Sequence, residues 1–283
     1  MKCFSSGWWS DWRPVSCKLQ GEPVWRAKPA FMKDEVVWVT GASAGIGRAV
    51  VQRFAEAGAR VVAIARREDR LLELQQQFPD KVFVLVCDVT DEEKLRHALS
   101  ELTTPYNAPT VLVNNAGAAF GLEMAQSSRW SDWQRMIDLN VTSLVCMTHY
   151  VLPGMVERNR GHILNLGSVA GTYPYRGGQV YGASKAFVEQ FSLGLRCDLL
   201  GKQVRVTNIE PGAVQSEFAT VRFQGDTEKA AQIYKGFQPL TPADIAETVF
   251  WCASLPAHVN INRLEVMPLM QAPAGFVWHR DDA

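Results

Sequence analysis

Tyr181 and Lys185 form a pair that could carry out acid/base chemistry. Residues 180–187 have the pattern of the first turns of a helix that runs to about Leu200. The i, i+4 spacing places the phenol and the ammonium group on one helix face, with their Cβ atoms roughly 5–6 Å apart. A free tyrosine titrates near pH ~10 and an adjacent cation favours its phenolate, so Lys185 is expected to lower the pKa of Tyr181. Taken alone, a tyrosine and a lysine at this spacing are more often a structural pair.

Ser168 adds a second chemical group upstream of this pair. It directly follows the apolar run 162–167, which has the length and composition of a strand. Ligands of α/β sheets bind at the carboxyl ends of the strands. The hydroxyl of Ser168 could therefore hold a carbonyl or alkoxide oxygen while Tyr181 gives or takes the proton.

Strands and helices that alternate along the chain position these residues. Apolar runs predict seven strands, at residues 36–40, 60–65, 82–87, 110–113, 162–167, 204–209 and 261–267. Periodic segments between them predict helices, among them 68–78, 91–102, 130–158 and a last helix that begins after Thr241. This alternation predicts an α/β fold, a Rossmann-type doubly wound seven-stranded parallel sheet in a single domain.

The turn after the first strand has the composition of a dinucleotide site. Gly41, Gly45 and Gly47 lie between the first strand and the first helix, together with Ser43 and Ile46. Glycines let the backbone approach a pyrophosphate, whose charge faces the helix N-terminus. A glycine-rich turn alone is a weak signal, but its place in the first βα unit strengthens it. All five residues are expected to contact the cofactor.

The end of the second strand indicates which dinucleotide binds. An enzyme that uses NAD usually has an acidic residue there, which binds the ribose 2′-hydroxyl. This chain has Ala65 followed by Arg66 and Arg67. Guanidinium groups bind a 2′-phosphate, which a carboxylate would repel, so NADP is the predicted cofactor. The alternative is that both arginines merely solvate the start of a helix.

Two further strand ends are candidates for contacts with the cofactor. Asp88 closes the third strand and could accept a hydrogen bond from the adenine amino group, and Val89 follows it. Asn115, Ala116 and Gly117 follow the fourth strand and would pass their backbone close to the adenine ribose. All of them can also be ordinary turn residues.

Composition narrows the classes of partner. The chain has 29 basic and 29 acidic residues, and this balance does not favour nucleic acid. No apolar run approaches the ~18–20 residues that span a bilayer, and the start lacks a continuous apolar signal segment. Six scattered cysteines without metal-ligand spacing predict reduced, mostly buried thiols. We therefore expect a cytoplasmic protein without a metal, membrane or nucleic-acid partner.

Residues 1–31 differ in composition from the rest of the chain. They contain four of the nine tryptophans and three prolines, with no helical or strand period. The segment either docks onto the body through its indoles or remains loose, and a third possibility is that Met32 is the natural start. We expect a poorly ordered extension at 1–31 and one domain at 32–283.

The order of these motifs resembles the short-chain dehydrogenase/reductase superfamily over about residues 34–270. The matching residues are Thr40, Gly41, Gly45, Gly47, Asp88, Asn114–Gly117, Asn140, Ser168, Tyr181, Lys185, Pro211 and Gly212. The resemblance implies that Tyr181 is the acid/base and that Ser168 polarises the substrate oxygen. It also implies that Lys185 binds the nicotinamide ribose while lowering the pKa of Tyr181, and that Asn140 holds a water in a proton relay. Pro211 and Gly212 would contact the cofactor.

Four segments are similar to a narrower group, the NADP-dependent 3-hydroxy acid dehydrogenases. The segments are 151–159, 208–212, 221–226 and 255–262. The resemblance implies hydride transfer between NADP(H) and the 3-position of L-allo-threonine, L-serine or 3-hydroxypropionate, whose aldehyde is malonic semialdehyde. It also implies a cytosolic homotetramer.

Substrates of this kind carry a carboxylate, which requires a cation in the pocket. Arg222 lies in the insertion after Pro211 and Gly212 that is expected to close over the active site, and Arg176 is a second candidate. Either arginine can instead be a solvated loop residue. Two other functions remain open: a general NADPH-dependent carbonyl reductase of uncharged ketones, and a non-catalytic NADP-binding sensor.

Overall fold

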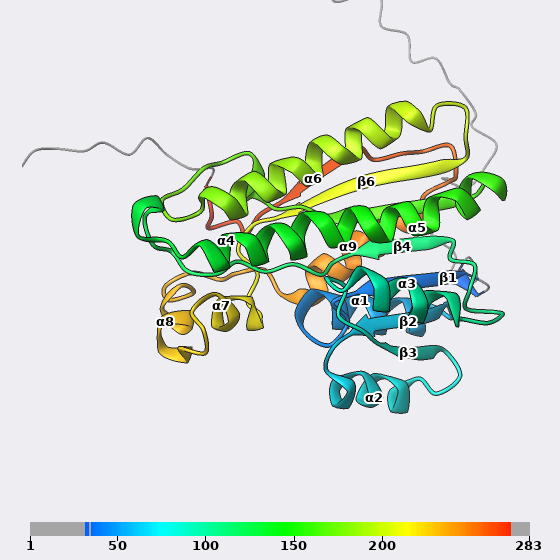
Figure 1. The fold of residues 1–283 in the computed structure, drawn as a ribbon, viewed down its shortest axis with the longest axis horizontal. Helices are drawn as coiled ribbons and strands as arrows, with labels where there is room; N and C mark the ends of the chain where they lie inside the picture. Colours follow the sequence, from blue (N-terminus) through cyan, green and yellow to red (C-terminus); the bar gives the residue numbers. More distant parts are fainter. Residues whose placement is uncertain (1–31, 34, 273–283) are drawn as a thin grey trace, which may run out of the picture.

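Seven parallel strands form one sheet at the centre of the protein (Figure 1). The structure is a computed structural model that describes residues 32–33 and 35–272. The strand order is β3-β2-β1-β4-β5-β6-β7, and every neighbouring pair is parallel. The strands are β1 (Val36–Thr40), β2 (Arg60–Ala65), β3 (Val82–Val86), β4 (Val111–Asn114), β5 (Gly161–Leu166), β6 (Val204–Pro211) and β7 (Arg263–Val266). The predicted doubly wound sheet is confirmed.

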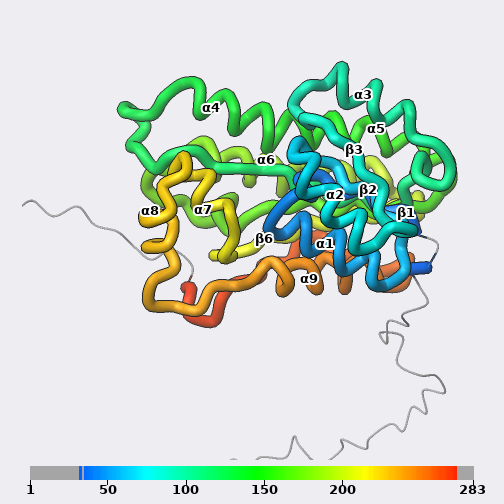
Figure 2. The backbone as a smooth tube through the Cα atoms, turned by 90° about the horizontal axis from the view of Figure 1, so that it is seen from below, coloured from blue at the N-terminus to red at the C-terminus, as the bar shows by residue number. Residues whose placement is uncertain are grey.

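Helices cover both faces of the sheet, which explains why the central strands are apolar on both sides. One layer contains α1 (Gly45–Glu56), α2 (Glu68–Gln77) and α9 (Pro242–Ser254). The other contains α3 (Glu92–Ser100), α5 (Ser143–Glu157) and α6 (Gln179–Asp198). Neighbouring residues of β1 alternate between them: Val37 packs in the first core, and Trp38 packs in the second. Figure 2 shows α1 and α9 on one side and α3 and α5 on the other.

The predicted helix 130–158 is continuous but not uniform. It consists of α4 (Trp130–Ile137), the π-helical turn η3 (Asp138–Thr142) and α5. Among the described residues, Trp130–Glu157 is the one helix that is long and apolar enough to cross a bilayer by length and composition alone. The helix itself was predicted, but the sequence patterns had not indicated that any segment meets this criterion of length and hydropathy. Its buried residues Met147, Val151 and Met155 pack in the core of the sheet, as in a helix of a soluble domain.

The segment after β6 forms two short helices that project beyond the sheet. These are α7 (Glu217–Arg222) and α8 (Thr227–Gln232), which lie together at one side of the molecule in Figure 1. The next helix, α9, begins as predicted. Thr241 caps it in a capping box with Asp244, and Pro242 occupies its first position.

Two expectations concern parts of the chain outside the site; one stays a prediction, and the other is met only in part. The extension at residues 1–31 lies outside the described residues, so its predicted disorder stays a prediction. Of the four described cysteines, which are free thiols, Cys87 and Cys252 are buried, Cys146 is half-buried and Cys197 is exposed. The thiols are therefore less uniformly buried than expected.

Candidate active site

The first turns of α6 bring Tyr181 and Lys185 into the interior at the carboxyl end of β5. Both side chains are buried, at 9% and 6% exposure. The Nζ atom of Lys185 donates a 2.6 Å hydrogen bond to the carbonyl oxygen of Leu166 and lies 5.8 Å from the centre of the Tyr181 ring. α6 can approach this closely because a Cβ on Gly182 would lie only 2.8 Å from the carbonyl oxygen of Ala170. The predicted pair therefore shares one buried face of the helix.

The expectation that Lys185 lowers the pKa of Tyr181 is wrong when only the groups of this chain act on the phenol. Burial raises the pKa of Tyr181 to about 12, against the opposing effects of a hydrogen bond with Ser168 and the charge of Arg222. Burial also lowers the pKa of Lys185 to about 8. An apolar environment disfavours the charged form of each group, and burial is the largest cause of both shifts. The spacing of the pair was predictable, but the degree of burial was not.

Ser168 lies where the sequence placed it, directly after β5. Its backbone is extended, and its Oγ accepts a 3.1 Å hydrogen bond from the amide of Ala170, which caps the short helix η4 (Val169–Gly171). The same hydroxyl is close enough to Tyr181 to lower the pKa of the phenol by hydrogen bonding. Ser168 and Tyr181 can therefore bind one substrate oxygen between them.

Asn140 is buried in the π-helical turn η3, and its amide is bound by protein groups. Nδ2 donates to the carbonyl oxygen of Ala118 at 2.9 Å and to Oγ of Ser184 at 3.0 Å. Oδ1 accepts from the amide of Ala118 at 2.9 Å. The side chain thus ties the loop after β4 to α6. Its predicted role in holding a relay water stays a prediction, and its amide donors are already engaged.

The glycine turn has the geometry that only glycine permits. Gly41 and Gly45 have φ values of 67° and 52°, in the left-handed region. A Cβ on Gly47 would lie 2.4 Å from the carbonyl oxygen of Gly41, so α1 packs directly on the turn. Asn115 supports the turn through Nδ2, which donates to the carbonyl oxygen of Thr40 at 2.9 Å. The glycines therefore form a cradle of exposed backbone at the N-terminus of α1.

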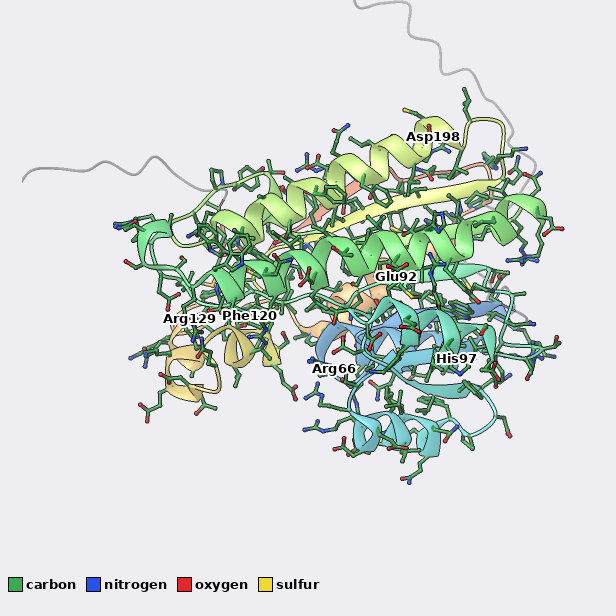
Figure 3. The ribbon with its side chains drawn as sticks, in the orientation of Figure 1. Arg66, Glu92, His97, Phe120, Arg129 and Asp198 are labelled. Atoms are coloured by element: carbon green, nitrogen blue, oxygen red, sulfur yellow. The ribbon has the colours of Figure 1, made fainter. Side chains whose placement is uncertain are left out.

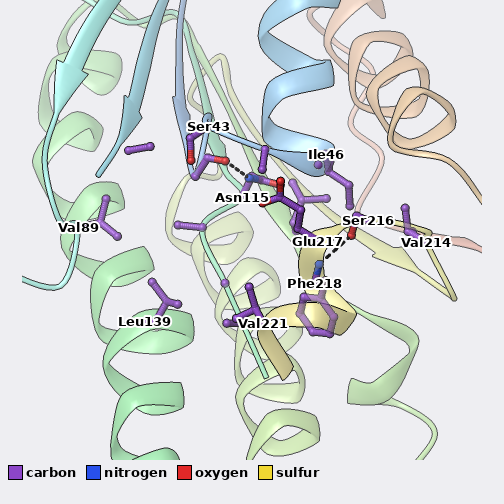
Figure 4. Close-up of a pocket in the computed structure, with 18 of the residues that line it drawn as sticks. Ser43, Ile46, Val89, Asn115, Leu139, Val214, Ser216, Glu217, Phe218 and Val221 are labelled. Atoms are coloured by element: carbon purple, nitrogen blue, oxygen red, sulfur yellow. Dashed lines mark hydrogen bonds between the residues drawn. The ribbon is translucent and has the colours of Figure 1, made fainter. Parts of the chain in front are cut away.

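A cavity of about 400 Å³ lies at the edge of the sheet where the strands have their carboxyl ends (Figure 4). Most of the predicted site residues line it: Gly41, Ser43, Gly45, Ile46, Arg66, Arg67, Asp88, Val89, Asn115, Ala116, Gly117, Ser168, Tyr181, Lys185, Pro211 and Gly212. The predicted residues Gly47, Asn140, Arg176 and Arg222 are not part of the lining. Sequence reasoning missed several others, among them Leu139, Val214, Ser216, Glu217, Phe218 and Val221. The last five follow Pro211 and Gly212 closely, and Leu139 directly precedes Asn140, which were the signals that could have found them.

The two predicted arginines have different environments. Figure 3 shows Arg66 at the surface, where its Nη1 lies 3.4 Å from Oδ2 of Asp88. Burial alone would raise the pKa of Asp88, but hydrogen bonds from Thr90 and the charge of Arg66 outweigh it and lower that pKa. Arg67 donates from Nε to Oγ of Ser43 at 3.1 Å. Arg67 is thereby held against the glycine turn.

These residues fit a dinucleotide that carries a 2′-phosphate. The cradle at Gly41 and Gly47 leaves no room for a Cβ. Ala65, at the end of β2, offers no carboxylate to a ribose hydroxyl, while Arg66 and Arg67 beside it line the same cavity. Arg66, Arg67 and the amides of the turn would hold the phosphates.

Arg222 and Arg176 have different positions relative to Tyr181. The guanidinium carbon of Arg222 lies 5.9 Å from the centre of the Tyr181 ring. Its Nη2 donates to Oη of Tyr175 at 2.7 Å, and its Nε donates to the carbonyl oxygen of Gly121 at 3.1 Å. Arg176 is exposed, and its Nη2 lies 3.8 Å from Sδ of Met124. The structure therefore places Arg222 beside Tyr181, although not among the residues that line the cavity, and it leaves Arg176 exposed at the surface.

The chain belongs to the short chain dehydrogenase family. The family profile with that description matches residues 35–227, a range that contains the glycine turn, Ser168, Tyr181 and Lys185. The resemblance inferred from the motifs is thereby confirmed.

Individual relatives within the family are similar to this chain over most of its length. The "NADP-dependent 3-hydroxy acid dehydrogenase YdfG" of Escherichia coli (strain K12) is 51% identical over 246 residues, which cover 87% of this chain and 99% of that protein. A "Serine 3-dehydrogenase" of Rhizobium radiobacter is 47% identical over 245 residues, which cover 87% of this chain and 98% of that protein. A solved structure described as "The Closed form of serine dehydrogenase complexed with NADP+" has a TM-score of 0.86 at 51% identity and covers 87% of this chain and 100% of its own.

Proposed function

We propose that this protein is an NADP-dependent oxidoreductase that transfers hydride between NADP(H) and the 3-position of a small 3-hydroxy acid. The observation that carries the proposal is one cavity lined both by Tyr181, Ser168 and Lys185 and by the glycine turn with Arg67. The similarity to dehydrogenases named for 3-hydroxy acids and for serine supports it. The candidate substrates are L-allo-threonine, L-serine and 3-hydroxypropionate, whose oxidation gives malonic semialdehyde.

Tyr181, Ser168 and Lys185 each have a separate role in the reaction. When bound in the cavity, NADP would supply the hydride acceptor of the oxidation at C4 of its nicotinamide, and its reduced form would supply the hydride of the reduction. In oxidation, Tyr181 in its phenolate form accepts the hydroxyl proton of the substrate at Oη, and in reduction the neutral phenol donates that proton. The hydroxyl of Ser168 donates a hydrogen bond to the same oxygen. Lys185, with a pKa of about 8, can take up or release a proton near neutral pH and can exchange it with the tyrosine.

Arg222 gives the pocket a cation for the substrate carboxylate. Its guanidinium group lies at the end of α7, beside the ring of Tyr181. A 3-hydroxy acid has only two C–C bonds of about 1.5 Å between the carbon that bears the hydroxyl and the carboxyl carbon, so its carboxylate lies close to its hydroxyl. Charge-assisted hydrogen bonds to the carboxylate would orient the 3-position toward Tyr181.

A screen of substrates and cofactors tests the proposal. Reduction of NADP is followed spectrophotometrically with L-allo-threonine, L-serine, 3-hydroxypropionate and a neutral secondary alcohol, and the series is repeated with NAD. We expect turnover of at least one 3-hydroxy acid with NADP, and much less with NAD or with the neutral alcohol. Preference for the neutral alcohol would instead support a general carbonyl reductase. Absence of turnover with every substrate, with NADP bound, would support a sensor.

We also propose a cytoplasmic homotetramer. Large apolar side chains on α6 support contacts between copies of the chain: Phe187 and Leu193 are 41% and 38% exposed. Phe187 stacks on Phe191 at a ring separation of 5.8 Å. Light scattering of the purified protein would test the state, with four copies per particle expected and a monomer contradicting it.

A further inference from the structure

A carboxylate already binds one of the arginines assigned to the cofactor phosphate. Glu217 begins α7, and Oγ of Ser216 caps that helix by accepting from the amide of Phe218 at 3.3 Å. Oε2 of Glu217 accepts a 2.8 Å hydrogen bond from Nη1 of Arg67. Its Oε1 lies 3.7 Å from Nη1 of Arg70. One acidic side chain from α7 therefore holds two guanidinium groups at the start of α2.

This ion pair lies at the cofactor turn. Nε of the same Arg67 donates to Oγ of Ser43, so the guanidinium group bridges the turn and α7. The cap of α7 is close to the turn as well, because a Cβ on Gly45 would lie 3.4 Å from Cβ of Ser216. Ser43, Gly45, Arg67 and Glu217 all line the cavity, and Figure 4 shows Ser43 and Glu217 there. Glu217 therefore occupies hydrogen-bond donors of the cofactor site.

Glu217 has opposite consequences for the two nicotinamide cofactors. The 2′-phosphate of NADP carries close to two negative charges at neutral pH and binds guanidinium groups through charge-assisted hydrogen bonds. A carboxylate on the same group repels that phosphate and occupies one of its donors. NAD carries a neutral hydroxyl at this position, so the carboxylate does not repel it.

We propose that Glu217 is a built-in competitor for the 2′-phosphate of NADP, which must displace the carboxylate from Arg67 and Arg70 in order to bind. The inference rests on the proposed cofactor site at Arg67. Glu217 thereby weakens the binding of 2′-phosphorylated nucleotides and leaves nucleotides without that phosphate unaffected. It is a residue that sets the degree of preference between the two cofactors.

The test measures binding of two nucleotide fragments to the full chain by calorimetry. Adenosine 2′,5′-bisphosphate carries the 2′-phosphate, and adenosine 5′-monophosphate does not. Glu217→Gln is expected to tighten binding of the bisphosphate by roughly threefold to tenfold and to leave the monophosphate unchanged. Glu217→Ala should act in the same direction. The matched control is Glu73→Gln, because Glu73 also lies on this side of the fold but pairs with Arg48 at 2.9 Å; it should change neither affinity.

Unchanged or weaker binding of the bisphosphate by both Glu217 variants would overturn the inference. An equal gain for both fragments would also overturn it, since it would indicate a general charge effect. Arg67→Ala separates this failure from a failure of the cofactor site itself. If Arg67→Ala removes the preference for the bisphosphate, the site stands whatever Glu217 does. If Arg67→Ala keeps that preference, the 2′-phosphate binds elsewhere. The proposed competition between Glu217 and the phosphate is then refuted as well.

Discussion

Replacement of Arg222 by alanine tests whether the pocket recognises a carboxylate. Loss of a charge-assisted hydrogen bond costs about 1.5–3 kcal/mol. At roughly 1.36 kcal/mol per tenfold change in rate, kcat/KM for a 3-hydroxy acid should fall by about 10- to 150-fold. The variant also loses the hydrogen bonds that Arg222 makes with Gly121 and Tyr175. That second loss adds about threefold to tenfold to the decrease, and it does so equally for the acid and for a neutral alcohol.

The measured quantity is therefore the ratio of kcat/KM for 3-hydroxypropionate to that for a neutral secondary alcohol. We expect Arg222→Ala to lower this ratio by at least tenfold. Arg222→Lys, which keeps the charge but not the planar donor pair, should lower it less. Tyr175→Phe removes the 2.7 Å partner of Arg222 but keeps the cation, and it should leave the ratio near the wild-type value. An equal loss for both substrates in Arg222→Ala would refute the role of this arginine in carboxylate binding.

Three further predictions address the proton carrier, the pH dependence and the glycine cradle. Tyr181→Phe should abolish turnover in a spectrophotometric assay while calorimetry still detects NADP binding; substantial residual turnover would mean that the acid/base is another group. Oxidation should accelerate about tenfold per pH unit up to about pH 8 and then level off, because burial raises the pKa of Tyr181 to about 12 and lowers that of Lys185 to about 8. Above pH 8 the phenolate form of Tyr181 still increases, but the ammonium form of Lys185 decreases in the same proportion, so the population that has both stays constant. The positive charge of bound NADP+ would move the profile to lower pH without changing its shape. A flat oxidation rate across the rising limb would contradict this assignment. Gly47→Ala should lower thermal stability by several degrees, because its Cβ would lie 2.4 Å from the carbonyl oxygen of Gly41 and such overpacking costs about 1–3 kcal/mol. Gly194→Ala, on α6 where no atom of the same chain lies within 4 Å of the new Cβ, should lower thermal stability much less, and equal effects of the two substitutions would disprove the packing argument.

Local patterns were sufficient to predict the sheet and the position of the catalytic pair. β1, β4 and β5 are buried along their whole length, so their sequences are apolar runs that differ clearly from the amphipathic helices. Tyr181 and Lys185 were predictable because helical geometry relates residues four positions apart. Parallel strands end at one edge of the sheet, which is why residues distant in the sequence line a single cavity.

Three features depend on contacts that no local pattern contains. The pKa of Tyr181 depends on burial by residues from several elements, so its direction could not be predicted from the neighbouring lysine. The π-helical turn around Asn140 interrupts a sequence that has an ordinary helical pattern. The pairing of Arg67 with Glu217 joins residues 150 positions apart, and nothing near either residue indicates it. Long-range packing decided all three.

The shortness of α7 has a consequence for protein engineering. A helix of six residues is too short to be stable by itself, so its order depends on the contacts at its two ends. Glu217 at one end contacts Arg67, and Arg222 at the other contacts Tyr175. Libraries that change residue 67 in order to switch nicotinamide preference will therefore also change how α7, and with it Arg222, is held before the cofactor binds. Successful redesign will require both ends of this segment to be varied together.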